Sequence, residues 1–236
     1  MKAVILAAGR GTRMKHLTDE LPKPMIPVKN KPILERIMQG LSSQAGIQDF
    51  FILVGYRAHT IQNYFGDGHS LGWKITYAEQ ITQDGTGKAV DYAKEWVGKD
   101  RFFLAYGDIL IAPHEYANCA QAFTEDGLIT VKKANDLSQG GAVVLDEKFY
   151  LKEIIEKSAT SSSSWYNTGF YGFTPTIFHY IAQLQKSPRG EYELTDALTA
   201  MAQDGLKIRG YELKTPWADV RDPVILEQLN QSSDWD

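Results

Sequence analysis

The sequence predicts an α/β fold, with a doubly wound, mostly parallel (Rossmann-like) central sheet, helices on both faces and a smaller antiparallel or mixed extension. Two features of the 236 residues predict it. In the first half, short continuous apolar runs, which are typical of strands buried on both faces, alternate with segments of helical periodicity. In the second half, several strand-like runs follow one another without intervening helices, which favours antiparallel or mixed pairing.

The expected elements alternate in a regular order along the chain. Strands are predicted at residues 3–8, 50–54, 73–78, 101–106, 128–133, 141–145, 151–156, 166–173 and 207–212. A first helix begins near Pro32 and stops at Gly46, and because it connects two strands as a crossover, these strands should be parallel. Further helices are predicted at residues 59–65, 88–96, 113–123, 175–184, 193–203 and 223–229.

The composition excludes several classes of protein. Hydrophobic residues make up 43% and charged residues 23% of the chain, as in a soluble globular protein, and the length favours one large domain. A net charge of −4 gives no support for nucleic-acid binding. Cys119 is the single cysteine, and we find neither a targeting segment nor an apolar run near the roughly 18 residues of a membrane span. We therefore expect a cytoplasmic protein with no membrane partner.

The loop after the first predicted strand has the residues of a phosphate cradle. Gly9 and Gly11 let the backbone approach a ligand closely and turn its N–H groups toward an anion. Thr12 adds a hydroxyl, and Arg13 adds a permanently charged bidentate donor. We therefore expect phosphate groups to bind at this loop.

Two common phosphate-binding motifs do not describe the loop. A dinucleotide-binding fingerprint requires a third glycine where Met14 stands. A P-loop requires Gly-Lys followed by Ser or Thr, whereas the pair Gly87-Lys88 is followed by Ala89. The loop is therefore expected to bind phosphate by a third design.

Two segments of the chain carry a family resemblance. The motif Leu6-Ala7-Ala8-Gly9-Arg10-Gly11-Thr12-Arg13-Met14 is followed, after a polar link, by Pro22-Lys23-Pro24-Met25 and Pro27-Val28. They resemble the signature of the sugar-1-phosphate nucleotidylyltransferases, which make NDP-sugars from an NTP and a sugar 1-phosphate. The resemblance extends from Lys2 to Leu229 and implies a single nucleotidyltransferase domain over residues 1–236. Its first part, to about residue 133, would bind the nucleotide, and residues 134–236 would bind the sugar and carry a second metal ligand.

The resemblance implies a nucleotide site in the first loop and in a segment after the third predicted strand. Its residues would be Leu6, Ala8, Gly9, Gly11, Thr12, Arg13, Gln80, Gly85 and Thr86. The Gln80 amide offers a donor beside an acceptor, which matches the N3–H and O4 edge of uracil or thymine. Gln80 precedes Gly85-Thr86-Gly87 at the spacing of uridylyl- and thymidylyltransferases, so UTP or dTTP is the expected nucleotide.

Two carboxylates stand at predicted strand ends, where a hard cation can bind. Asp108 and Asp219 match the family's metal ligands, and Mg²⁺ commonly uses two carboxylates together with substrate phosphates. Asp108 could instead cap a helix, since Asp is common at that position. Asp222 competes with Asp219, but its place before Pro223 favours a role as N-cap of the last helix.

Arg13 and Lys23 are the predicted catalytic cations. The sugar phosphate, with about two negative charges, must approach a triphosphate with about four, and this repulsion is large in a dry site. Lys23 lies between Pro22 and Pro24, which fix the backbone. The resemblance places both cations on phosphate groups. The reaction needs no general base, because its nucleophile, the sugar phosphate, is already an anion.

The resemblance also implies a sugar-phosphate site formed by Gly141, Glu156, Lys157 and Asn167. Asn167 lies in an aromatic strand, where Asn is disfavoured without a partner, whereas Gly141 could be a turn and Glu156-Lys157 an exposed pair. Many relatives have proline after this Glu-Lys pair, but here Ser158 begins a serine-rich loop. The sugar pocket is therefore expected to differ from that of the family.

The expected reaction is Mg²⁺-dependent in-line attack of a sugar 1-phosphate on the α-phosphate of an NTP, which supplies precursors for cell walls or polysaccharides. Few residues follow Leu229, so we expect a single activity with no β-helix acetyltransferase domain. Two alternatives stay open: cytidylyl or guanylyl transfer to another phosphomonoester such as phosphocholine, and a non-catalytic sensor of nucleotide-sugars. A monomer and a homo-oligomer are equally compatible with the sequence.

Overall fold

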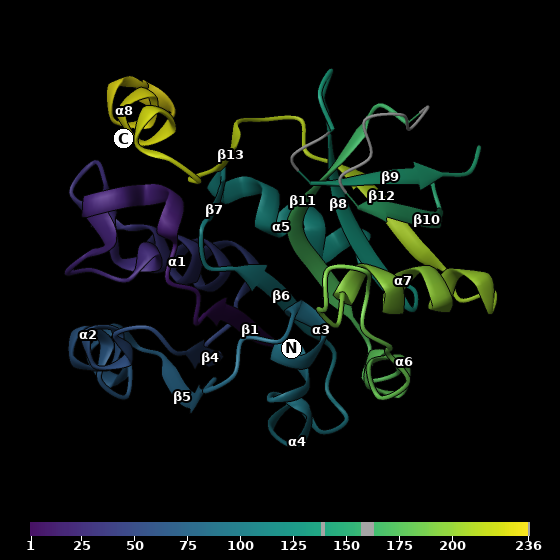
Figure 1. Ribbon diagram of the computed structural model, residues 1–236, viewed down its shortest axis with the longest axis horizontal. Coiled ribbons are helices and arrows are strands. Elements are labelled where there is room, and N and C mark those ends of the chain that lie inside the picture. The colour runs from purple at the N-terminus through teal and green to yellow at the C-terminus, as the bar shows by residue number, and fades with distance from the viewer. Residues whose placement is uncertain (138–139, 157–162, 236) are drawn as a thin grey trace. The chain divides into compact units, whose positions relative to one another are not determined.

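The computed structural model describes residues 1–137, 140–156 and 163–235 (Figure 1). The chain divides into two compact units. The first unit contains Met1–Gln83, Leu104–Asn118 and Thr215–Asp236, and the second contains Asp84–Phe103 and Cys119–Lys214. Each unit is therefore built from segments that are separated in the sequence.

The first unit contains the parallel part of the sheet. β1 (Lys2–Ala7), β4 (Asp49–Val54) and β5 (Lys74–Glu79) are parallel neighbours, with Val4 opposite Phe51 and Ile52 opposite Tyr77. β6 (Phe102–Tyr106) lies beside β1, so the order is β6-β1-β4-β5. The predicted parallel strands are confirmed, and the apolar residues of β1 and β4, except Leu6, are buried, as their composition predicts.

The helices of the first unit cover buried apolar side chains. They are α1 (Ile33–Ala45), α2 (Ala58–Phe65), the first part of α5 (Pro113–Ala122) and α8 (Pro223–Gln231), with 3-10 turns η1 (Thr12–Thr18), η2 (Lys23–Met25), η3 (His69–Leu71) and η4 (Ser233–Trp235). Ile37, Met38 and Leu41 of α1 are fully buried, as their helical spacing predicts. The helix ends at Gly46, whose left-handed backbone (φ 67°) provides the predicted stop.

Two short antiparallel ribbons complete the first unit. β2 (Pro27–Val28) pairs with β3 (Lys31–Pro32), and β7 (Ile109–Ile111) pairs with β13 (Trp217–Asp219). The sequence predicts neither ribbon, because strands of two or three residues are too short to show a period. The second ribbon joins the chain that follows β6 to the last segment of the unit.

The second unit contains the mixed part of the sheet. β9 (Gly141–Leu145) is antiparallel to β10 (Leu151–Glu156) and to β11 (Trp165–Phe173). β11 is also antiparallel to β8 (Gly127–Lys133), which pairs in parallel with β12 (Ile208–Glu212). The predicted antiparallel or mixed extension is therefore confirmed.

The helices of the second unit are short. They are α3 (Thr86–Asp91), α4 (Lys94–Val97), α6 (Ile177–Ile181) and α7 (Leu194–Gln203), and α7 packs against β10 and α6 (Figure 1). The single helix predicted at residues 88–96 is wrong, because α3 and α4 are separate. The Ala93 N–H bonds to the Val90 carbonyl, three residues back, so the backbone tightens and the first helix ends there.

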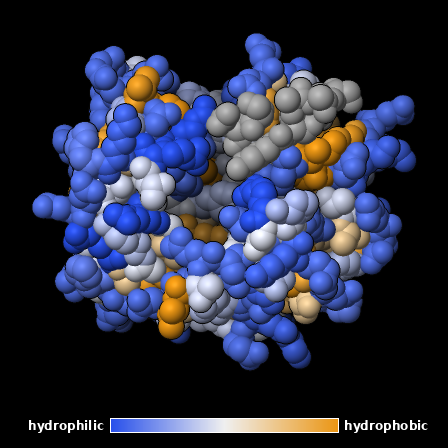
Figure 2. Space-filling model, in the orientation of Figure 1, coloured by the Kyte–Doolittle hydropathy of each residue, from blue (hydrophilic) through white to orange (hydrophobic). Residues whose placement is uncertain are grey.

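The surface is mainly polar on the face drawn in Figure 2, where hydrophobic side chains form small separate groups. Such small groups are common on soluble proteins and need no partner to explain them. Within the described ranges, no helix combines the length and the apolar character needed to cross a membrane.

Candidate active site

The glycine-rich loop follows β1 in the first unit, as predicted. Gly11 has a left-handed backbone (φ 71°), and a Cβ at this position would lie 2.7 Å from the Cβ of Lys23. A Cβ at Gly9 would meet no atom within 4 Å. Gly11 therefore allows Lys23 to approach the loop, whereas Gly9 leaves open space in which a ligand can lie.

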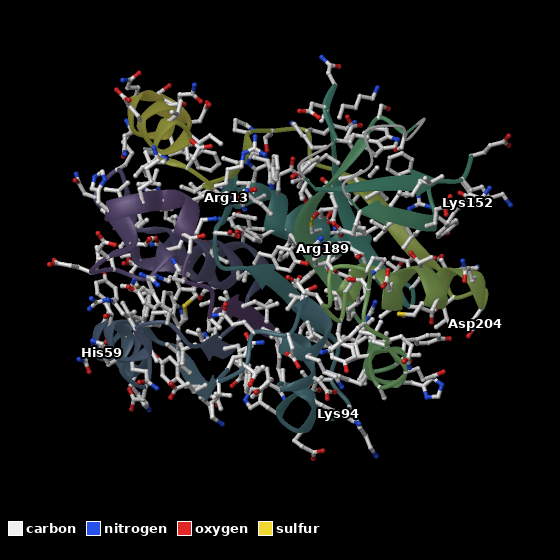
Figure 3. The ribbon with its side chains drawn as sticks, in the orientation of Figure 1. Arg13, His59, Lys94, Lys152, Arg189 and Asp204 are labelled. Carbon is white, nitrogen blue, oxygen red and sulfur yellow. The ribbon has the colours of Figure 1, made fainter. Side chains whose placement is uncertain are left out.

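The other predicted residues of this loop differ in exposure. Leu6 belongs to β1, and Ala8, which directly follows the strand, is buried. Thr12 and Arg13 begin η1 and are exposed, so their side chains are accessible to a ligand (Figure 3).

Lys23, Asp108 and Asp219 form a charged cluster in the first unit. Lys23 Nζ donates to Asp108 Oδ2 at 2.5 Å and lies 3.7 Å from Asp219 Oδ1, while the Lys23 side chain is only 8% exposed. One ammonium group is thus flanked by two carboxylates. The cluster brings together a predicted catalytic cation and both predicted metal ligands.

The ribbon of β7 and β13 places the two carboxylates next to each other. Asp219 ends β13 and pairs with Ile109, which begins β7, and the Val220 N–H donates to the Asp108 carbonyl (2.9 Å). Asp108 stands between β6 and β7, and α5 begins only at Pro113, so Asp108 does not cap a helix. Backbone hydrogen bonds therefore fix the separation of two residues that are far apart in the sequence.

Asp222 has the structural role that the sequence favours for it. It is the N-cap of α8, and its Oδ1 accepts hydrogen bonds from the N–H groups of Val224 and Ile225, both at 3.0 Å. Pro223 follows at the first helical position. The prediction of an N-cap is confirmed, and the Asp222 carboxylate accepts hydrogen bonds from the first turn of α8.

The environment of Asp219 raises the pKa of its carboxyl. Burial is the main cause and the charge of Asp108 adds to it, whereas Lys23, Arg13 and Arg221 act in the opposite direction. Asp219 Oδ1 is also buried without a hydrogen-bond partner. Asp219 therefore has a buried oxygen without a hydrogen-bond partner, and a divalent cation held by Asp108 and Asp219 would supply a partner for it.

The number of carboxylates limits the kind of metal site. Among the described residues, no three or more His, Cys, Asp and Glu side chains are grouped to hold a metal ion. Asp108 and Asp219 would provide two oxygen ligands, and water or phosphate oxygens would provide the others. This donor set fits Mg²⁺, which keeps several waters and binds through one or two carboxylates plus substrate phosphates.

Gln80 is held at the end of β5 in the first unit. Its side chain is buried (8% exposed), and its backbone N–H donates to the Val54 carbonyl (2.8 Å). In the following loop, Gln83 Nε2 donates to the Ala8 carbonyl (2.9 Å). The loop that begins with Gln80 is thereby attached to the residue before Gly9.

Gly85 and Thr86 are held by a neighbouring segment of the second unit. Gly85 has φ 118°, and a Cβ there would lie 2.5 Å from the backbone N and O of Tyr192. The Tyr192 N–H donates to the Asp84 carbonyl (2.8 Å), and Thr86 Oγ1 accepts from the Leu194 N–H (3.1 Å). Close packing against Tyr192 therefore requires glycine at position 85, whatever ligand it contacts.

Three of the predicted sugar-binding residues meet in the second unit. Glu156 is opposite Gly141 in the β9–β10 pair, and Tyr166, next to Asn167, is opposite Ala142. A Cβ at Gly141 would lie 3.3 Å from Glu156 Oε1 and 3.5 Å from the Cβ of Asn167. Gly141, Glu156 and Asn167 therefore border the same spot on three adjacent strands.

Asn167 has internal partners in its strand. Its Nδ2 donates to the Tyr171 hydroxyl (2.7 Å), and its Oδ1 accepts from the Gly169 N–H (3.3 Å). The sequence predicts that Asn167 needs a partner in this strand, and these two hydrogen bonds provide at least part of it inside the protein. Lys157 and residues 158–162 of the predicted serine-rich loop lie outside the described residues.

The sequence interpretation missed Arg189, which contacts the predicted sugar site. Arg189 Nη1 lies 3.8 Å from Glu156 Oε2, and the same guanidinium contacts Glu191 at 3.0 Å and Glu193 at 3.6 Å (Figure 3). Glu193 is buried. The only local signal is the charged run around Arg189, because its contact with Glu156 is a long-range one.

These features combine a glycine-rich loop with a lysine that lies against two carboxylates, in a protein of α/β fold. The chain belongs to the nucleotidyl transferase family, whose sequence profile matches residues 2–232. This match covers both units and confirms the family that the two motifs near the N-terminus indicate.

Individual relatives are similar over nearly all of the chain. The UTP–glucose-1-phosphate uridylyltransferase AglF of Haloferax volcanii is 32% identical over 99% of this chain and 100% of its own length. The low-salt glycan biosynthesis nucleotidyltransferase Agl11 of the same organism is 32% identical over 98% of this chain and 65% of its own length. The bifunctional protein GlmU of Methanococcus aeolicus is 35% identical over 98% of this chain and 54% of its own length. The chain thus spans about half to two thirds of Agl11 and GlmU.

Solved structures share the fold. A putative glucose-1-phosphate thymidylyltransferase from Bacillus anthracis, in complex with sucrose, has a TM-score of 0.88 and 27% identity, over 98% of this chain and 94% of that chain. A UDP-glucose pyrophosphorylase complexed with UDP-glucose has a TM-score of 0.86 and 21% identity, over 98% and 97% of the two chains, and this likeness concerns the fold alone. The predicted fold class is confirmed.

Proposed function

We propose that this protein is a Mg²⁺-dependent sugar-1-phosphate nucleotidylyltransferase that uses UTP or dTTP and releases pyrophosphate. The observation that supports this best is the cluster in which Lys23 contacts Asp108 and Asp219 beside the glycine-rich loop. Family membership makes nucleotidyl transfer the expected chemistry. The cluster supplies the charges that this chemistry requires.

The reaction is direct displacement at phosphorus. An oxygen of the sugar 1-phosphate attacks the α-phosphorus, the bond to the bridging oxygen of the β-phosphate breaks, and pyrophosphate leaves with the electron pair. The nucleophile is already an anion, so the protein needs to position and neutralise the reactants but does not need to remove a proton.

Different residues of the first unit neutralise the phosphates, hold the metal and make room for the triphosphate. Arg13, which is exposed at the start of η1, and Lys23 neutralise phosphate oxygens as the two anions approach. Asp108 and Asp219 would hold Mg²⁺, which when bound polarises the α-phosphate and stabilises the negative charge on the departing oxygen. The open space beside Gly9 gives the triphosphate room to lie against the backbone.

The preference for a pyrimidine nucleotide rests on Gln80 and on the relatives. The buried Gln80 amide can donate to O4 and accept from N3–H of uracil or thymine. The match to the whole length of a UTP-dependent uridylyltransferase supports UTP, and the structural likeness to a putative thymidylyltransferase supports dTTP. Gly85 and Thr86 stay predicted nucleotide-binding residues.

The sugar 1-phosphate is assigned to the second unit. Gly141, Glu156 and Asn167 border one spot, where Glu156 and Asn167 can bind sugar hydroxyls. Arg189, which contacts Glu156, adds a cation near this spot. Lys157 stays a predicted ligand of the sugar phosphate.

A substrate panel tests the proposal. Purified protein is mixed with each of UTP, dTTP, CTP, GTP and ATP, with several sugar 1-phosphates or phosphocholine, and released pyrophosphate is measured with Mg²⁺ and with EDTA. We expect the highest rates with UTP or dTTP and a sugar 1-phosphate, and none with EDTA. Absence of turnover with every pair would reject the enzyme in favour of a sensor, whereas a preference for CTP with phosphocholine would replace the substrate assignment.

A further inference from the structure

Tyr56 of the first unit holds the glycine-rich loop at both ends. Its backbone N–H donates to the Ala8 carbonyl (3.0 Å), where the loop begins. Its hydroxyl donates to the Thr18 carbonyl (2.9 Å) and lies 3.2 Å from the Asp19 carbonyl, where η1 ends. Between these points Lys15 has a left-handed φ of 56°, which is strained for a residue with a side chain. The loop therefore depends on outside contacts, and Tyr56 provides them.

Arg57 reinforces the same support. Its Nη2 donates to the Asp19 carbonyl (2.5 Å), and its guanidinium carbon lies 5.8 Å from the centre of the Tyr56 ring. Arg57 adopts a left-handed φ of 52° at the start of α2. The hydrogen bond from Arg57 to the Asp19 carbonyl forms although this backbone conformation is unfavourable. Tyr56 and Arg57 therefore both hold the end of the loop.

Arg10 lies on the Tyr56 ring in the middle of the loop. Its guanidinium carbon is 5.3 Å from the ring centre, within the range of a cation–π interaction. Arg10 is exposed, and in the part of the chain that the structure describes it forms no ion pair with a carboxylate. It stands between Gly9, beside which space is open, and Gly11. Lys23 differs, because its ammonium lies between the carboxylates of Asp108 and Asp219.

We propose that Arg10, held on the ring of Tyr56, binds the β- and γ-phosphates of the nucleotide, which leave as pyrophosphate. This inference rests on the proposed function and adds a residue to it. Asp108, Asp219 and Lys23 are grouped in one cluster, and Arg10 offers the outer phosphates a cation in addition to Arg13. Arg10 is available because no carboxylate among the described residues pairs with it, and the aromatic face orients the guanidinium without neutralising it. Tyr56 is a positioning residue, which acts through Arg10 and through the ends of the loop.

Calorimetry with inorganic pyrophosphate and Mg²⁺ tests the role of Arg10. Arg10→Ala should weaken pyrophosphate binding by about tenfold to a hundredfold, the loss expected when a charge-assisted hydrogen bond is removed. Binding of UMP should be unchanged, because UMP lacks the outer phosphates. Lys94→Ala, which removes an exposed cation of α4 (Figure 3), is the matched control and should leave both affinities at the wild-type value.

Variants of Tyr56 separate the ring from the hydroxyl. Tyr56→Leu removes both the ring and the hydroxyl and should weaken pyrophosphate binding at least as much as Arg10→Ala does. Tyr56→Phe keeps the ring and should lose less. Adding Arg10→Ala to Tyr56→Leu should cause little further loss, because both changes remove the same interaction. Tyr77→Phe, which removes a hydroxyl bonded to the Gly66 carbonyl, controls for the loss of a tyrosine hydroxyl elsewhere in the unit.

Three results would overturn the proposal: wild-type pyrophosphate affinity in Arg10→Ala, equal losses for UMP and pyrophosphate, and no binding of pyrophosphate by the wild type. Arg10 is exposed, so Arg10→Ala should fold even where Tyr56→Leu does not, and circular dichroism checks this. Calorimetry requires no turnover. An inactive substrate panel would therefore reject the proposed reaction separately from the role of Arg10 in binding pyrophosphate.

Discussion

Replacing Lys23 with methionine tests whether one buried ammonium holds Asp108 and Asp219 together. Methionine has an unbranched side chain, so the change removes the charge with little change of shape. Lys23 Nζ lies 2.5 Å from Asp108 and 3.7 Å from Asp219, and the side chain is 8% exposed. Removing one partner of a buried ion pair costs about 3–5 kcal/mol, because the other charge is left without compensation. At roughly 2–4 °C per kcal/mol for a chain of this size, the thermal midpoint should fall by about 6–20 °C at neutral pH.

The loss should depend on pH. Burial and Asp108 raise the pKa of the Asp219 carboxyl above its ordinary value of 3.8, so the folded state favours the protonated form. The stability that comes from Asp219 is complete below pH 3.8 and is lost as the pH rises through the raised value. Lys23 acts against this rise, and its removal therefore costs most at neutral pH. When the Asp219 carboxyl is protonated, the stability of Lys23→Met should lie closer to that of the wild type.

Thermal unfolding followed by circular dichroism measures this at neutral and acidic pH, with and without Mg²⁺. Mg²⁺ should restore part of the stability of Lys23→Met at neutral pH, because a cation that binds the native carboxylates stabilises the native state. Lys31→Met is the matched control. Lys31 Nζ lies 3.8 Å from Glu35, but the side chain is 36% exposed, so the change should cost at most about 1 kcal/mol. An equal loss for Lys23→Met at both pH values would refute the reasoning, since packing would then be the cause.

Three further predictions concern single residues. Asp108→Asn should abolish pyrophosphate release while keeping the circular dichroism spectrum of the wild type, and an active variant would contradict the metal assignment. Gly141→Ala would place a Cβ 2.9 Å from Ile154 Cγ2 and 3.3 Å from Glu156 Oε1, so KM should rise for the sugar 1-phosphate but not for the NTP; equal rises would count against a sugar site there. Asp222→Ala should lose the cap of α8 at a cost of about 1 kcal/mol, or roughly 2–4 °C in the thermal midpoint, with unchanged kcat. A large loss of activity would instead identify Asp222 as a metal ligand.

The sequence predicts those helices and strands whose type is determined by residues close together in the chain. β1 and β4 are continuous apolar runs, and α1 has an apolar face with a glycine stop at Gly46, so their type and place follow from burial and backbone preference. The capping role of Asp222 follows in the same way, because the cap and the proline after it are adjacent.

Features that depend on distant pairing are absent from the local pattern. The ribbon of β7 and β13 joins three-residue strands from separate segments of the chain. Neither strand has a sequence pattern that indicates which segment it pairs with. The contact of Arg189 with Glu156 and the packing of Gly85 on Tyr192 are likewise long-range. The sequence identifies Asp108, Asp219 and Lys23 as candidates, but only the paired strands explain why an ammonium lies against both carboxylates.

The division of the chain fixes the order in which the molecule can be completed during synthesis. The second unit has all its residues once Lys214 has been made, whereas the first unit still lacks the segment that begins at Thr215. A chain grows from its N-terminus, so until that segment emerges β7 has no partner strand and Lys23 can pair only with Asp108. The pairing of Asp108 and Asp219, the two predicted metal ligands, is therefore among the last features to form. A ribosome that stopped before Asp219 would release a chain with the glycine-rich loop but with only one of the two predicted metal ligands.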